Sequence, residues 1–113
     1  MRLLHNPRCS KSREALALLS ARGDVIEVIE YLKTPLSAPE LGALFDALGV
    51  EPPAAMRFQD DLAKSLGLAA TDPRSRDEWI ALLCAHPALL ERPIAIKHGR
   101  AVIGRPPQRV LEL

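Results

Sequence analysis

The sequence has few cysteines and no long apolar run, and both scarcities exclude classes of protein. Among its 113 residues only Cys9 and Cys84 are cysteines. Two cysteines are too few for the disulfide scaffold of a small secreted domain, and they lack the spacing of a metal site. No apolar stretch approaches the length that spans a bilayer, and no charged-then-apolar leader opens the chain. We therefore expect a cytoplasmic protein that binds no metal and does not enter a membrane.

The chain also lacks an excess of charge of either sign. It carries 15 Lys and Arg residues against 14 Asp and Glu, a formal net charge of +1. This balance gives no broad electrostatic attraction to nucleic acid or to a membrane surface. A hydrophobic share of 48% and a charged share of 26% are ordinary for a globular protein. We expect one domain over residues 1–113, and a monomer.

What the sequence does have is one cysteine in a distinctive setting. Residues 5–13 read His-Asn-Pro-Arg-Cys-Ser-Lys-Ser-Arg, between a short apolar strand and a helix. At the first turn of a helix, free backbone N–H groups and the positive end of the macrodipole favour thiolate over thiol. The same amides can bind an oxyanion, so one loop can hold a nucleophile and its anionic substrate. We expect Cys9 to be the reactive centre, the alternative being a small buried hydrophobic residue.

The residues on either side of Cys9 predict a βαβ unit. Residues 2–5 read as a strand, 10–22 as a helix closed by Gly23, and 25–31 as a second strand rich in β-branched residues. Two strands joined by a helix within about 30 residues are parallel with a right-handed crossover. Cys9 would then lie at the carboxyl end of the sheet, where ligands bind.

A helical block and a hairpin follow. Capping boxes at Ser37–Glu40 and Ser75–Glu78 open two helices, and a brief helix over 60–66 lies between them. Ile94–Lys97 and Arg100–Ile103 form an antiparallel hairpin, and Pro107 starts a short last helix. Cys84 lies among apolar residues of its helix, so we expect it in the core rather than as a resolving thiol. The order predicts an α/β protein with a mixed four-stranded sheet flanked by helices.

Several separated motifs together resemble the glutaredoxin-dependent arsenate reductases. The matching stretches are 5–13, Tyr31-Leu32-Lys33-Thr34-Pro35, Arg57, His86-Pro87, Glu91-Arg92-Pro93-Ile94 and Gly104-Arg105-Pro106. The likeness covers essentially the whole chain and is closest to the shorter, arsenate-reductase-like branch. It implies a thioredoxin-like fold with a helical insertion between the βαβ and ββα halves. That fold agrees with the element order.

The resemblance also implies a chemistry and a set of residues. The Cys9 thiolate would attack arsenate or a related oxyanion, and arsenite would leave last. Arg92, Arg105 and Arg57 match the three substrate-binding arginines, whose guanidinium groups suit an oxyanion. His5 and Ser12 match supporting residues that tune or hydrogen-bond the cysteine. Pro93 matches the proline that is cis beside the active cysteine of thioredoxin-like folds, so we expect a cis Arg92–Pro93 bond.

The resemblance implies an external reductant in place of a bound cofactor. Ser12 stands where a Cys-x-x-Cys pair would have its second cysteine, so no local resolving thiol exists. Glutathione and glutaredoxin would then supply the electrons. Two alternatives remain open: a thiol-based redox regulator that binds RNA polymerase, and a monothiol exchange enzyme acting on glutathione mixed disulfides.

Overall fold

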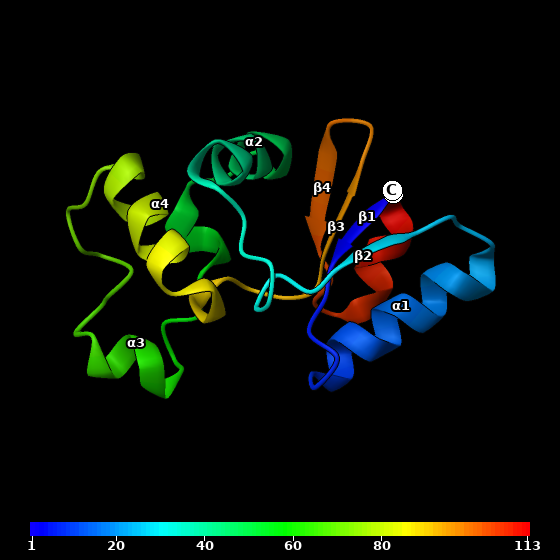
Figure 1. The fold of residues 1–113 in the computed structure, drawn as a ribbon, viewed down its shortest axis with the longest axis horizontal. Coiled ribbons are helices and arrows are strands. Elements are labelled where there is room, and N and C mark those ends of the chain that lie inside the picture. The colour runs from blue at the N-terminus through cyan, green and yellow to red at the C-terminus, as the bar shows by residue number, and fades with distance from the viewer. The chain divides into compact units, whose positions relative to one another are not determined.

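The structure is a computed structural model that describes residues 1–113, and it contains a four-stranded mixed sheet (Figure 1). The strands, β1 to β4, are Arg2–Leu4, Glu27–Ile29, Ile94–Lys97 and Arg100–Ile103. Their order is β2-β1-β3-β4. β1 runs parallel to β2 and antiparallel to β3, and β3 and β4 form the antiparallel hairpin. The predicted fold class and strand pairing are confirmed.

The contacts divide the chain into two compact units. The first unit comprises Met1–Pro35 and Arg92–Leu113, and the second comprises Leu36–Glu91. The whole sheet lies in the first unit with helix α1 (Ser10–Arg22) and the 3₁₀ helix η3 (Pro107–Glu112). The second unit holds α2 (Ala38–Leu48), η1 (Pro52–Ala55), α3 (Asp61–Ser65), α4 (Arg76–Ala85) and η2 (Pro87–Leu89). It corresponds to the helical insertion that the sequence predicts, and the assignment of one domain to residues 1–113 stays a prediction.

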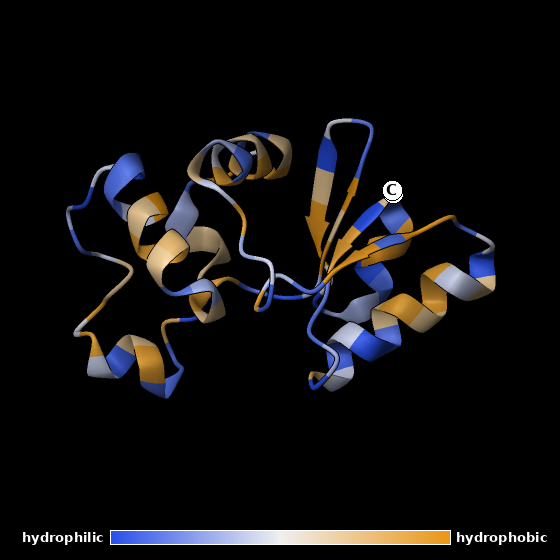
Figure 2. Cartoon of the chain, in the orientation of Figure 1, coloured by the Kyte–Doolittle hydropathy of each residue, from blue (hydrophilic) through white to orange (hydrophobic).

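Apolar side chains from the sheet, α1 and η3 form the core of the first unit. Helices α1 and η3 contact each other extensively, and the hydropathy colouring shows the apolar strands beside them (Figure 2). The fully buried cluster consists of Leu3, Ala15, Leu19, Ala95 and Val110. Burying each large aliphatic side chain contributes about 1.5–3 kcal/mol. This packing fixes the start of α1 relative to the strands, and so positions Cys9.

Strand β2 is shorter than the sequence predicts. The β-branched run over 25–31 suggested a longer strand, but only Glu27–Ile29 pairs with β1. The neighbouring strand limits its length. β1 has only three residues, and residues of β2 that lie beyond them have no backbone partner, whatever their preference for strand structure. Val25 consequently lies outside the sheet with 89% of its surface exposed.

The second unit is built on the two helices with the strongest start signals. Ser37 caps α2 and Ser75 caps α4, each in a complete capping box with the glutamate three residues later. Helices α2 and α4 pack against each other, and the Trp79 ring meets Phe58 edge to face, with 5.7 Å between the ring centroids. No helix of the chain combines the length and the apolar character needed to cross a membrane.

Candidate active site

Cys9 occupies the N-cap of α1, as its position in the sequence predicts. Its backbone is extended, with φ −94° and ψ 121°, and the first turn of α1 contains no acidic residue. The backbone N–H groups of this first turn therefore favour a thiolate at Cys9 without a competing carboxylate. Burial raises the pKa of Cys9, but hydrogen bonds from Ser12, Lys11 and Arg92 outweigh it and hold that pKa below its ordinary value. The site is built for a thiolate.

The loop before Cys9 is held by its own hydrogen bonds. The amide of Cys9 donates to the Asn6 carbonyl at 3.0 Å, and the amide of Arg8 donates to Asn6 Oδ1 at 3.0 Å. From inside α1, Arg13 reaches back, and its Nη1 donates to the Pro7 carbonyl at 2.9 Å. These bonds tie both ends of the loop together, so the cysteine is placed before any ligand arrives.

His5 and Ser12 form a buried pair beneath the loop. His5 Nδ1 lies 2.6 Å from Ser12 Oγ, and the amide of Asn6 donates to the same oxygen at 3.1 Å. Ser12 has no exposed surface and His5 only 6%. Burial lowers the pKa of His5, Glu30 opposes this shift, and Arg13 adds to it, so the imidazole is neutral at neutral pH. The Ser12 hydroxyl thus bonds His5 and the Asn6 amide, while the Ser12 backbone amide helps to lower the pKa of Cys9.

Arg92 and Arg105 meet at the same sulfur. Arg105 Nε donates to the Arg92 carbonyl at 2.9 Å, and Arg105 Nη2 lies 3.9 Å from Cys9 Sγ. The Arg92 side chain also hydrogen-bonds Cys9. The Arg92–Pro93 bond is cis, as the sequence predicts, and so is Arg105–Pro106. Two guanidinium groups and one thiolate are therefore gathered by residues far apart in the sequence, in an arrangement that suits an oxyanion.

Gly104 allows Arg105 to reach this position. The amide of Gly104 donates to the Pro93 carbonyl at 2.8 Å, which binds the end of β4 to the start of β3. A Cβ atom at residue 104 would lie 2.8 Å from Pro93 Cγ and 2.9 Å from Val110 Cγ1, both too close. The Gly-Arg-Pro motif therefore needs glycine so that the chain can pass Pro93 and present Arg105 to Cys9.

Arg57 belongs to the second unit, where it has two carboxylate partners of its own. Its Nε lies 2.6 Å from Asp60 Oδ2, and its Nη1 lies 2.7 Å from Glu91 Oε1. Burial would lower the pKa of Arg57, but hydrogen bonds and charges from Asp60 and Glu91 raise it above its ordinary value. Its guanidinium is consequently neutralised within the second unit, and its role in substrate binding stays a prediction.

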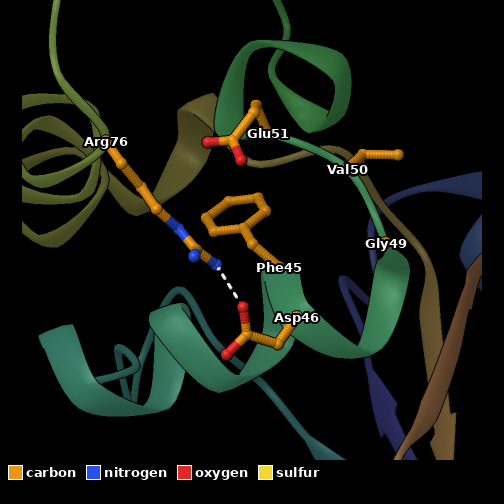
Figure 3. Close-up of a pocket in the computed structure, with 6 residues that line it drawn as sticks. All are labelled: Phe45, Asp46, Gly49, Val50, Glu51 and Arg76. Carbon is orange, nitrogen blue, oxygen red and sulfur yellow. Dashed lines mark hydrogen bonds and ion pairs between the residues drawn. The ribbon is translucent and has the colours of Figure 1, made fainter.

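The other chemistry-bearing groups of the second unit form no comparable site. Cys84 is half-buried on α4, with its sulfur 4.0 Å from the Leu36 carbonyl oxygen. A pocket of about 280 Å³ lies between α2 and α4 (Figure 3). Across it, Arg76 Nη2 donates to Asp46 Oδ1 at 2.9 Å and to the Gly42 carbonyl at 3.0 Å. No cluster of three or more His, Cys, Asp and Glu side chains in the structure could hold a metal ion.

Sequence reasoning missed two residues that shape the site. Asn6 accepts hydrogen bonds within the loop through its side chain and its carbonyl, and Arg13 ties the loop to α1. For Asn6 a signal existed, because Asn-Pro is a turn-forming pair whose side chain bonds the backbone two residues on. For Arg13 there was none, because a long side chain on a first helical turn usually points to solvent.

Alkylation of Cys9 should proceed faster at neutral pH than alkylation of an ordinary thiol. The lowered pKa populates the thiolate, so the rate should rise through a midpoint below the ordinary cysteine pKa of about 8.5. Iodoacetamide labelling against pH, read by mass spectrometry of the Cys9 peptide, measures this midpoint. Sulfate or phosphate should slow the labelling by occupying the same anion site. A midpoint equal to that of Cys84 in the unfolded protein would contradict an activated thiol.

Comparisons with known proteins agree with this geometry. Residues 4–113 match the model of the ArsC family. The chain is 46% identical over 112 residues to an arsenate reductase of Neisseria meningitidis serogroup A, covering 97% of this chain and 94% of that protein. It is 33% identical over 111 residues to an arsenate reductase of Escherichia coli, covering 98% of this chain and 78% of that protein.

A solved structure gives the same result for the fold. The arsenate reductase from Vibrio cholerae superposes with a TM-score of 0.91 at 46% identity, covering 99% of this chain and 97% of that one. The thioredoxin-like fold predicted from the sequence is therefore confirmed, together with the resemblance that predicted it.

Proposed function

This chain belongs to the ArsC family, and on that premise we propose that it reduces arsenate to arsenite through the Cys9 thiolate. The observation that carries the proposal is the meeting of Arg92 and Arg105 at the Cys9 sulfur, with Arg105 Nη2 at 3.9 Å. A nucleophile and two oxyanion-binding groups at one point are what attack on an anionic substrate requires. The relatives named arsenate reductase support arsenate as that substrate.

The chemistry begins with an attack of the Cys9 sulfur on arsenic(V). A sulfur–arsenic bond forms, an arsenic–oxygen bond breaks, and the departing oxygen leaves as water after protonation. Two external thiols then supply the two electrons, so that H₂AsO₄⁻ and two RSH give H₂AsO₃⁻, one disulfide RSSR and water. Arg92 and Arg105 neutralise the charge that accumulates when a thiolate meets an anion.

The reductant in this proposal is glutathione together with glutaredoxin. Ser12, not cysteine, follows Cys9 by three residues, and its hydroxyl is bound by His5 and Asn6. Without a neighbouring thiol the oxidised or arsenic-bound Cys9 needs sulfur from another molecule. No bound cofactor takes part in this scheme, and the protein acts as a cytoplasmic monomer.

A coupled assay tests the proposal directly. Arsenate, glutathione, glutaredoxin, glutathione reductase and NADPH are mixed with the protein, and arsenate-dependent NADPH oxidation is followed together with arsenite formation. We expect turnover that requires all three of arsenate, glutathione and this protein. Turnover of a glutathione mixed disulfide at the same rate without arsenate would favour the monothiol exchange enzyme instead. Absence of both activities, with capture of RNA polymerase by the reduced protein, would favour the regulator.

Arg57→Gln should separate a structural from a substrate-binding role of this arginine. The variant leaves Asp60 and Glu91 without their shared cation, so we expect a loss of about 1–2 kcal/mol of stability and a melting temperature about 4 °C lower or more. Because the guanidinium is already neutralised, the KM for arsenate should rise less than in an Arg105 variant. Calorimetry and arsenate kinetics measure both quantities. An unchanged melting temperature with a strongly raised KM would instead indicate direct contact with arsenate.

A further inference from the structure

Two basic side chains next to Cys9 in the chain have no partner in the structure. Arg8 directly precedes the cysteine, Lys11 lies in the first turn of α1, and both residues are exposed. Neither side chain forms a hydrogen bond or an ion pair. Basic residues elsewhere on the surface do have a carboxylate close by in sequence, as in the pairs Lys33–Glu30, Arg74–Asp72 and Arg109–Glu112. The charges of Arg8 and Lys11 are therefore left without a counterion from the chain.

The charged groups around the reactive sulfur are nearly all cations, all of them in the first unit: Arg8, Lys11, Arg13, Arg92 and Arg105. Glu14 is the one carboxylate within residues 5–14. Glu30, whose charge acts on His5, is paired with Lys33. Charges of one sign gathered beside a site raise the local concentration of oppositely charged reactants and speed their arrival. The surroundings of Cys9 therefore favour anions over neutral molecules.

We propose that Arg8 and Lys11 determine the specificity of Cys9 for anionic reactants by attracting them to the sulfur, without holding them there. The inference rests on the proposed function only for the identity of the natural anion. Arg105 is fixed by its bond to the Arg92 carbonyl and can hold an anion in one place. Arg8 and Lys11 have no such bond, so they act through their field, which extends about 10 Å at 0.1 M salt. Their effect belongs to the encounter and not to the bound state.

Two alkylating reagents of opposite charge class test the proposal without arsenate. Iodoacetate is an anion and iodoacetamide is neutral, but both form the same sulfur–carbon bond at Cys9 and release iodide. The ratio of their rate constants cancels any change in the thiolate fraction. In the double variant Arg8→Gln/Lys11→Gln we expect this ratio to fall about fivefold at low salt. The difference from the native protein should shrink below about twofold in about 1 M NaCl, where the field extends only about 3 Å.

Arg2→Gln/Arg100→Gln is the matched control, because it removes the same amount of charge from the first unit. Both arginines are exposed, and neither side chain has a partner in the structure. They lie at the end of the sheet opposite to the β1–α1 loop, near the β3–β4 turn (Figure 1). This variant should keep the native ratio. Equal ratios in the two double variants would overturn the proposal, and so would a fall that persists in 1 M NaCl, because it would indicate direct contact with the anion.

Arsenate kinetics extend the test to the proposed substrate. At low salt the Arg8→Gln/Lys11→Gln variant should lose at least about fivefold in kcat/KM for arsenate with kcat unchanged, since a faster encounter does not alter the chemical step. An equal loss in kcat would contradict the proposal by placing the two residues in the chemistry. If the native protein shows the alkylation preference but does not turn over arsenate, the proposed function fails while the role of Arg8 and Lys11 stands.

Discussion

Replacing Cys9 with serine is expected to lower arsenate turnover by at least about 10³-fold. The N-terminal amides of α1 and the Arg92 guanidinium stabilise an ionised sulfur, but a serine hydroxyl stays protonated at neutral pH and is a poor nucleophile toward arsenic. The fold should persist, because Cys9 is only partly buried and serine is itself a favoured residue at a helix N-cap. The coupled assay with matched circular dichroism spectra measures both effects.

Cys84→Ser is the matched control for that experiment. Cys84 is the other cysteine of the chain, is also partly buried, and lies on α4 in the second unit with its sulfur against the Leu36 carbonyl. We expect this variant to keep most of the native turnover. If Cys84→Ser lost as much activity as Cys9→Ser while remaining folded, Cys84 would be a resolving thiol, contrary to its interpretation as a core residue.

Arg105→Lys should lower kcat/KM for arsenate by about 10²–10³-fold, the usual cost of removing one preorganised anion-stabilising group. Lysine keeps the positive charge but lacks the planar guanidinium group. In arginine, Nε of that group donates to the Arg92 carbonyl while Nη2 lies beside the Cys9 sulfur. A single ammonium group cannot hold both contacts, so the charge is no longer fixed beside the sulfur. Steady-state kinetics with arsenate as the varied substrate measure the loss.

Arg109→Lys is the control for the arginine substitution. Arg109 lies four residues further along, on η3, where its exposed side chain pairs with Glu112 at 3.5 Å. We expect native kinetics from it, because an exposed pair of this kind contributes little. Equal kcat/KM in the two variants would contradict a role for Arg105 in binding the oxyanion.

The helix boundaries show which parts of the fold were readable from the sequence. Both capping boxes form as predicted, since the serine and the glutamate three residues later satisfy each other's backbone groups locally. Strand β2 could not be bounded in this way, because its length depends on how many residues β1 offers for pairing. Local signals succeed where the interaction partners are close in sequence.

Cys9 shows the same division within the site. The sequence by itself determined that a cysteine begins a helix with no acidic first turn, and hence that a thiolate is favoured there. It could not determine that the Ser12 hydroxyl bonds His5, because side-chain direction depends on what is buried beneath the loop.

Only the tertiary structure decided how the arginines are used. Arg92 and Arg105 come together because the β3–β4 hairpin folds back on itself and Gly104 passes close to Pro93. Arg57 is instead bound by Asp60 and Glu91, a pairing over 34 positions in the case of Glu91. From the sequence, an arginine is known only to be a long, positively charged side chain. Long-range packing decides whether its guanidinium binds a carboxylate, a carbonyl or a sulfur.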